Sequence, residues 1–385
     1  MTTATKDPVL VVVQLSGGND YLNTVVPYSD PNYYDSRRTL NIPEDKVLHI
    51  DDQLGFHPAM GPMARMYAEG NVAVIHGIGY ENSVRSHFRS MDIWHTCEPE
   101  KVGTEGWLGR AIREIDPSGE NPVTAVNIGH GLPRALVAPG VSVASVADLT
   151  TYGLLTDIEE RERREKVLRR FSNIYAPAVG AGQVMDYLGQ TGRDALKGAD
   201  ILKAAPEQYS SSVEYANTGI GRSLRDIAMT HVAGLGSRIF YTQHGSYDTH
   251  AGQAVVHNKL WDELSVAISD FWDDLREHNA DENVIMYLFS EFGRRVRDNG
   301  SGTDHGAAGV AFVIGPRVRG GMYSTYPETR AEALDQGDLV PNVDFRSSYT
   351  TVLEDWLGID AVPIVNGSFE KLAFVGNGSP ATNGA

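Results

Sequence analysis

Two stretches of the chain are almost entirely apolar and lack the polar–apolar alternation of a half-buried strand. They are residues 9–15 (VLVVVQL) and 284–289 (VIMYLF). Such runs are typical of strands buried on both faces in the middle of a parallel α/β sheet. Shorter apolar runs at 71–75, 238–242 and 310–314 predict further strands of the same kind.

Helical periodicity separates these runs. Apolar positions recur with a helical period over 255–278, and a helix over 59–69 would end at Gly70. Further helices are predicted over 88–95 and 348–358. Strands that alternate with helices indicate an α/β fold, with helices packed on both sides of one sheet.

The remaining segments complete the predicted organisation. Residues 27–56 are interpreted as a surface excursion, and the short strand-like pieces in 103–150 as a substrate-side insertion. Residues 151–235, including the charge-dense run 157–170, are expected to form a helical layer or cap within a single domain over 1–373. The low-complexity residues 374–385 are expected to be a disordered tail.

Acidic and imidazole side chains follow the predicted strands. Asp20 follows the first strand, Asp248 and His250 follow another, and Glu291 and His305 lie beyond the strand at 284–289. Open α/β sheets bind ligands at the carboxyl ends of their strands. A mixed set of nitrogen and oxygen ligands suits Zn²⁺ or Mn²⁺, so one or two divalent ions are predicted here. Turn or capping roles are the alternative for each of these residues taken singly.

Ser86 precedes a predicted helix. Unpaired N–H groups and the helix dipole at such a position stabilise an anion or an activated alkoxide. The alternative is that Ser83 or Ser86 merely caps the helix.

Composition narrows the possible partners. A net charge of −17 argues against nucleic acid or an anionic membrane as partner. The single cysteine, Cys97, excludes an internal disulfide, and no apolar run approaches the ~20 residues of a membrane span. The N-terminus lacks the features of a signal peptide, which predicts a cytoplasmic protein, or a periplasmic or secreted one if an export signal has been trimmed.

Six segments together resemble a known bacterial family. The segments are SGGNDYLNTVVP (16–27), LGFHPAM (54–60), RSHFRS (85–90), QHGSYDTHAGQ (243–253), SEFGRRVRDNGSGTDHG (290–306) and DFRSSYTTVLEDWLG (344–358). In this order they resemble the domain-of-unknown-function family numbered 1501, over nearly the whole chain. That family is similar to the alkaline phosphatase and sulfatase superfamily, which implies a three-layer α/β/α sandwich around a largely parallel sheet.

The resemblance also implies roles for particular residues. Asp20, Asp248, His250, Glu291 and His305 would bind metal, and Ser86 would be the nucleophile. Arg85, Arg89 or Arg294 would hold the oxygens of an anionic ester, and His87 would protonate the leaving group.

Two departures from the superfamily pattern bear on the metal site. The third motif is Asp-x-His instead of Asp-x-x-x-His, and Phe292 stands where the superfamily has a histidine. A second metal would then have oxygen ligands only, and Phe292→His is expected to strengthen that site. The prediction is a metal-dependent phosphate or sulfate ester hydrolase. The alternatives are a catalytically degenerate metal-binding or scaffold protein, or a metalloenzyme of another reaction class.

Overall fold

The computed structural model describes residues 6–149, 166, 170, 197–198 and 200–376. Nine strands form one sheet in the order β11-β5-β10-β9-β1-β8-β6-β7, with β12 also paired to β5. The strands are β1 (Val9–Leu15), β5 (Val72–Gly79), β6 (Ala125–Ile128), β7 (Ala144–Val146), β8 (Ile239–His244), β9 (Val284–Phe289), β10 (Gly309–Ile314), β11 (Gly321–Tyr323) and β12 (Val343–Asp344). Strand β10 is antiparallel to both neighbours, and the other pairs are parallel.

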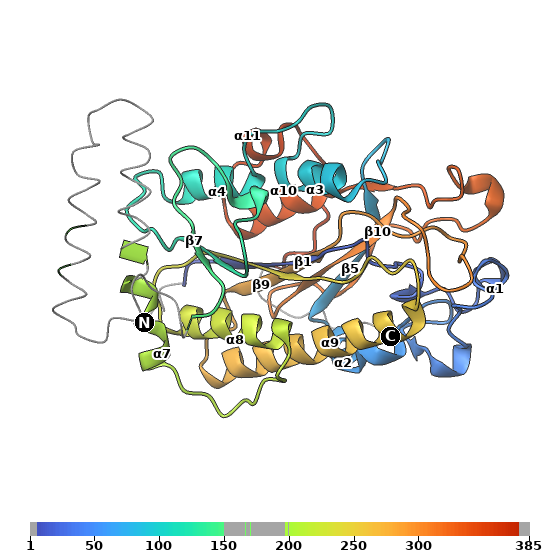
Figure 1. Cartoon of the computed structure of the whole chain (residues 1–385), viewed down its shortest axis with the longest axis horizontal. Coiled ribbons are helices and arrows are strands. Elements are labelled where there is room, and N and C mark those ends of the chain that lie inside the picture. The colour runs from blue at the N-terminus through green and yellow to red at the C-terminus, as the bar shows by residue number, and fades with distance from the viewer. Residues whose placement is uncertain (1–5, 150–165, 167–169, 171–196, 199, 377–385) are drawn as a thin grey trace.

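Helices cover both faces of this sheet (Figure 1). On one side lie α2 (Gly61–Ala68), α8 (Gly219–Val232) and α9 (Gln253–Glu277). On the other lie α3 (His87–Thr96), α4 (Trp107–Ile115), α10 (Phe345–Thr351) and α11 (Val362–Val365). The arrangement is the three-layer α/β/α sandwich with a mostly parallel sheet that the sequence predicts.

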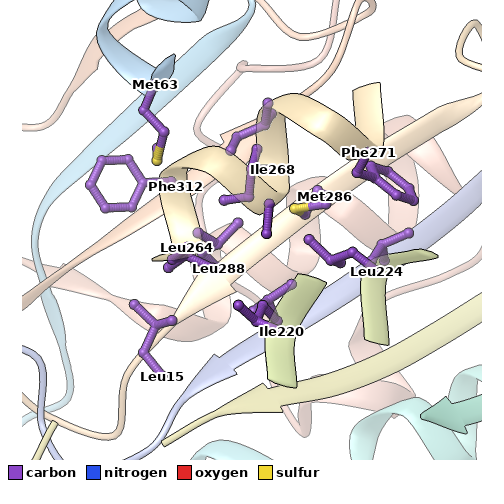
Figure 2. Packing of buried hydrophobic residues seen from close by; sticks show 14 of the residues in the cluster. Leu15, Met63, Ile220, Leu224, Leu264, Ile268, Phe271, Met286, Leu288 and Phe312 are labelled. Carbon is purple, nitrogen blue, oxygen red and sulfur yellow. The ribbon is translucent and has the colours of Figure 1, made fainter. Parts of the chain in front are cut away.

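The two apolar runs are the two central strands, and their side chains divide between the layers. Met286 and Leu288 of β9 pack with the α8 and α9 side, while Ile285 and Tyr287 face the α3 and α10 side. Figure 2 shows Met286 and Leu288 against Ile268 of α9, with α8 nearby. Burial on both faces explains why these strands show no polar alternation.

Two sequence interpretations are wrong. Residues 125–128 and 144–146 are strands of the main sheet, so 103–150 is not an insertion, and residues 134–136 form a 3₁₀ helix where a strand-like piece was expected. Residues 27–56 are not only a surface excursion: they carry helix α1 (Pro31–Ser36) and strands β3 (Leu48–His49) and β4 (Gly55–Phe56), which form a small sheet with β2 (Val25–Val26). Arg37 in this segment is completely buried.

Some expectations fall outside the described residues. These are most of the helical layer or cap over 151–235, nearly all of the charged run 157–170 and most of the tail 374–385. Within the described part of the chain, α7 (Ala205–Gln208) and α8 are helical. No described helix combines the length and apolarity needed to cross a membrane.

Candidate metal centre

Three loops meet where β1, β8 and β9 end. Ser290, directly after β9, donates to the carbonyl of Leu15 at 2.7 Å and accepts from the backbone N–H of Asn19 at 2.9 Å. Gly17 has φ +122°, and a Cβ there would lie 2.3 Å from the backbone nitrogen of Asp248. A glycine is therefore needed for the loop after β1 to approach the loop after β8 this closely.

Helix α3 begins at the same edge of the sheet. Ser86 occupies its N-cap position but makes no side-chain capping hydrogen bond, and the residue is exposed. Ser90, one turn into the helix, donates to the backbone carbonyl of Glu291 at 2.6 Å. This bond fixes the start of α3 against the loop after β9, so His87 faces the ends of the central strands.

A long loop returns His305 to this place. Arg294 and His305 form an isolated antiparallel bridge, and Gly306 donates its N–H to the carbonyl of Gly293 at 2.9 Å. The twelve positions from 294 to 305 therefore form a closed loop. Its two ends stand side by side, and His305 lies beside the loop that carries Asp248.

Asp248 and the three histidines form what we term the histidine–aspartate cluster: His87, Asp248, His250 and His305. The Nε2 atoms of His250 and His305 each lie 3.1 Å from Oδ1 of Asp248, and Nε2 of His87 lies 3.5 Å from Oδ2. One ligand atom from each of His87, Asp248 and His305 lies within 4.8 Å of the others. His250 stands on their outer side, with its side chain 46% exposed.

Each imidazole of the cluster has an oxygen beside its other nitrogen. The Nδ1 atoms contact Oε1 of Glu291 at 2.7 Å (His87), Oδ1 of Asp304 at 3.2 Å (His250) and the carbonyl of Arg85 at 2.8 Å (His305). An oxygen at Nδ1 fixes the ring orientation and favours the tautomer with an unprotonated Nε2. Metal-binding histidines in proteins are held in this way.

The cluster fits a divalent metal on its own geometry. Nε2 of His87 is buried and has no hydrogen-bond partner, which is uncommon for a buried polar atom. The Nε2 atoms of His250 and His305 face each other at 2.9 Å, and at most one of them can donate to the other. An ion among these nitrogens and the Asp248 carboxylate would satisfy all of them, and the N/O donor set suits Zn²⁺ or Mn²⁺.

Arg294 holds Asp248 from the buried side. Its Nη2 lies 2.7 Å from Oδ1 of Asp248, and its side chain is completely buried. Partial burial raises the pKa of Asp248, but hydrogen bonds from Arg294 and His305 outweigh this and lower the pKa to about 2. The other bonds of the guanidinium go to the carbonyls of Gly17, Gly18, Tyr247 and Thr303. Arg294 therefore organises the loops and has no group turned to solvent for an ester, contrary to its expected role.

Asp20 occupies different surroundings. Its Oδ1 accepts from Nη2 of Arg37 at 2.9 Å, and its Oδ2 accepts from Nη1 of Arg37 at 2.5 Å and from Gln253. Both side chains of the ion pair are fully buried. Both oxygens of Asp20 are thus engaged, and the residue is not part of the group of donors that converge at His87, Asp248 and His305.

The other expected site residues surround the cluster. Oε1 of Glu291 accepts from the N–H of Gly17 at 2.9 Å and contacts His87, and Oε2 of Glu291 accepts from Oγ of Ser290 at 3.2 Å. Phe292 is buried, with its ring centroid 4.9 Å from those of both His87 and His305. Arg85 is paired with Asp338, its Nη2 lying 2.6 Å from Oδ2.

Sequence reasoning missed Arg37, Gln253 and Asp338, which engage the expected residues from distant segments. No local pattern marks these partners. The sequence also suggested His87 as a proton donor, whereas Nε2 of His87 lies among the possible metal-ligating atoms of Asp248 and His305.

Comparisons with solved structures found distant similarities. The chain resembles a protein of the alkaline phosphatase superfamily from Vibrio parahaemolyticus, with a TM-score of 0.43 and 8% identity over 94% of this chain and 69% of that one. It resembles the PsFucS1 sulfatase from Pseudoalteromonas sp., with a TM-score of 0.43 and 11% identity over 97% and 73%. The zinc complex of the C-terminal periplasmic domain of EcEptC from Escherichia coli gives 0.36 and 7% over 81% and 73%. Likeness at this level transfers no activity.

No curated protein matches the sequence. The family described as "Protein of unknown function (DUF1501)" matches residues 7–354. Because this match covers most of the chain, the protein belongs to the DUF1501 family.

Proposed function

We propose that the protein is a metal-dependent hydrolase of a phosphate or sulfate ester, with Ser86 as nucleophile. One observation carries the proposal: three imidazoles have Nδ1 beside an oxygen and Nε2 directed toward one carboxylate. The buried Nε2 of His87 has no hydrogen-bond partner and lies 3.5 Å from Oδ2 of Asp248, which leaves its lone pair free for a metal.

His87, Asp248 and His305 would hold one divalent ion, Zn²⁺ or Mn²⁺, with His250 as an outer fourth donor. When bound, such an ion polarises an ester oxygen and lowers the pKa of a neighbouring hydroxyl or water. Asp20 is excluded from this set because Arg37 and Gln253 engage its oxygens. With Glu291 bonded to Gly17 and His87, no ligand set for a second ion is left among these residues, so we assign a single metal.

Several features support Ser86 as the nucleophile. It is exposed, it precedes His87 of the cluster, and its hydroxyl makes no capping bond that would have to break. The N-terminus of α3 stabilises negative charge near it. Ser86 Oγ forms a bond to phosphorus or sulfur as the bond to the ester oxygen breaks, and the proton of Ser86 passes to water. The leaving oxygen takes a proton from water, and a second water releases the anion from Ser86.

His87 is not assigned as the general acid. Its Nδ1 is 2.7 Å from Oε1 of Glu291, and its Nε2 is directed into the cluster, so neither nitrogen faces a leaving group. The hydrogen bond with Glu291 raises its pKa above the ordinary value in the metal-free protein. The cluster is open to solvent at Asp248 and His250, each about half exposed, so water can supply the proton.

Elemental analysis together with a substrate screen tests the proposal. The protein is freed of metal by chelation, reloaded with Zn²⁺ or Mn²⁺, and assayed on phosphate and sulfate monoesters. We expect one equivalent of metal per chain and activity that Ser86→Ala abolishes without loss of metal. Metal binding without any ester hydrolysis would favour another reaction class. Absence of both would identify a degenerate scaffold.

A further inference from the structure

A small cavity adjoins the cluster on the side of α3. Its volume is about 330 Å³, near the lower end of the roughly 300–1,000 Å³ typical of ligand pockets. His87 and Glu291 form part of its lining, so it opens onto one proposed metal ligand and onto the carboxylate that contacts it. One small ring of a ligand would occupy it beside an ester bound at the cluster.

One wall of the cavity is an unsupported aromatic ring. Phe88 follows His87 directly in α3, and it is 92% exposed, the most exposed of the large apolar residues described. Met91, one turn further along the helix, lines the same wall. A phenylalanine exposed to this degree buries little apolar surface in the folded chain, and its flat face can cover the apolar face of a ligand ring.

The floor of the cavity is polar and rigid. Gln14 and His95 are 5% and 6% exposed, and Nε2 of His95 lies 3.0 Å from Oε1 of Gln14. Gln14 donates from Nε2 to Oγ of Ser16 at 2.7 Å. Ser16 then meets only a long 3.5 Å contact with Gln243, so its hydroxyl proton is available to a ligand oxygen. Burial lowers the pKa of His95 to about 3, which makes this floor uncharged.

The charged groups around the cavity are already paired. Nη1 of Arg134 lies 3.2 Å from Oδ1 of Asp92, and Nη1 of Arg89 lies 2.6 Å from Oδ2 of the same carboxylate. Glu291 is paired with His87. A second anionic group on a ligand would therefore meet no uncommitted cation among the residues that line the cavity. A wholly apolar ring would displace water from Ser16 and leave its hydroxyl proton only the long contact with Gln243.

We infer that this cavity binds a neutral, hydroxyl-bearing ring, such as a monosaccharide unit, with its apolar face on Phe88 and its hydroxyl groups on Ser16 and Gln14. The inference rests on the proposed function for its place in catalysis, since the ring would be the alcohol part of the ester. It extends that proposal from an ester of unspecified alcohol to an ester of a polyol ring.

Binding of neutral methyl hexopyranosides to the metal-loaded protein tests the cavity without any need for hydrolysis. Saturation-transfer NMR and titration should show binding that Phe88→Ala weakens about ten-fold, because the covered face of the ring is lost. Phe88→Trp should preserve it, and so should Val362→Ala, which removes an exposed apolar side chain on α11 outside the cavity. Cyclohexanol, a ring of the same size with a single hydroxyl, should bind about ten-fold more weakly than the best hexoside.

Failure of this inference differs from failure of the proposed function. If no hexoside in the panel binds, or if Phe88→Ala binds like the wild type, the assignment of the cavity is overturned even when simple esters are hydrolysed. If hexosides bind in a Phe88-dependent manner but no ester is hydrolysed, the cavity assignment stands and the hydrolase proposal fails. Hexoside binding should also persist in Ser86→Ala, which keeps the two outcomes separate.

Discussion

Asp20 and Asp248 each follow a strand of the same sheet, and each accepts hydrogen bonds from a fully buried arginine. The side chain of Asp20 is completely buried and both of its oxygens are bonded to Arg37, whereas that of Asp248 is 47% exposed. Arg294 takes only Oδ1 of Asp248, and Oδ2 is left toward His87. Under the proposed function, an acid at a strand end binds the metal or remains a structural anion according to how many of its oxygens the protein itself satisfies.

The largest effect is expected from breaking the buried pair. Arg37→Met leaves Asp20 charged and unpaired in the interior, which should lower the free energy of unfolding by about 3–5 kcal/mol. Denaturant unfolding measures this loss. The double variant Asp20→Asn with Arg37→Met should recover part of it, because the unpaired charge is gone. Metal content should be unchanged in Asp20→Asn, and loss of metal from a stable Asp20→Asn protein would instead make Asp20 a ligand.

The different surroundings of Asp20 and Asp248 could not be predicted from the sequence, although the strands that carry these residues could. Residues 9–15 and 284–289 predict central strands because an apolar run without alternation has few other uses, and the structure confirms both. The position of Asp248 and His250 follows from the rule that parallel strands present their carboxyl ends at one edge. His305 reaches them through the closed loop that ends at its bridge with Arg294. These predictions rest on local pattern and on general topology.

Pairing across distant segments leaves no such local signal. Arg37 lies 17 positions from Asp20 in a polar stretch, and nothing in its neighbourhood distinguishes it from a surface arginine. Glu291 also follows a strand, as Asp248 does. Its carboxylate, however, contacts Gly17 and Nδ1 of His87, so it supports the His87 ring from the side away from the proposed metal. Which partner reaches which carboxylate is decided by tertiary packing.

The next largest effect is expected on the metal affinity of variants in the histidine–aspartate cluster. Asp248→Asn and His305→Ala remove donors from the cluster, so metal affinity should fall by more than the about 10–100-fold typical of a residue that only orients a ligand. Competition titration with a metal chelator measures the affinity. Metal-free Asp248→Asn should unfold below the melting temperature of metal-free wild type, because the buried Arg294 loses its carboxylate partner. Metal-free His305→Ala should change that temperature less, because its ring leaves no buried charge unpaired. Only the wild type should gain stability with metal.

Glu291→Gln probes the support of His87. The amide keeps the shape of the side chain but loses the charge that holds the Nδ1 proton, so metal affinity should fall about 10–100-fold while one equivalent still binds. The same titration measures it, with Asp304→Asn as the matched control for His250. Because His250 is half exposed, the control should show a smaller loss. An equal loss in the two variants would contradict the assignment of His250 as an outer donor.

The variant Phe292→His tests whether a second metal ion can bind beside the cluster. The phenylalanine is buried, 2% exposed, against the rings of His87 and His305. With Asp20 and Glu291 engaged elsewhere, we expect the new imidazole to find no second ion and to cost about 1–3 kcal/mol as a buried polar group. Denaturant unfolding and metal analysis are measured on the same protein. A second equivalent of metal, held without loss of stability, would restore the two-metal site that the family resemblance implies.

The smallest effect concerns pH, and the two regions should respond at opposite ends of the scale. Burial raises the pKa of Asp20, but the charge of Arg37 outweighs this effect and lowers the pKa below its usual 3.8. The Asp20–Arg37 pair therefore stabilises the protein above that pH, and this contribution is lost as the pH falls through the folded-state pKa.

The hydrogen bond with Glu291 raises the pKa of His87. The His87–Glu291 pair therefore contributes fully to stability below about pH 6.5, and this contribution is lost as the pH rises through the folded-state pKa. Metal binding requires a neutral His87, so stabilisation by Zn²⁺ should grow over the same interval. Urea unfolding of metal-free wild type and Glu291→Gln between pH 5 and about pH 9 isolates the pair, and the two curves should converge on the alkaline side. Curves that stay parallel throughout would show that Glu291 does not hold the charge of His87, and the bracing of the metal site from Nδ1 would lose its support.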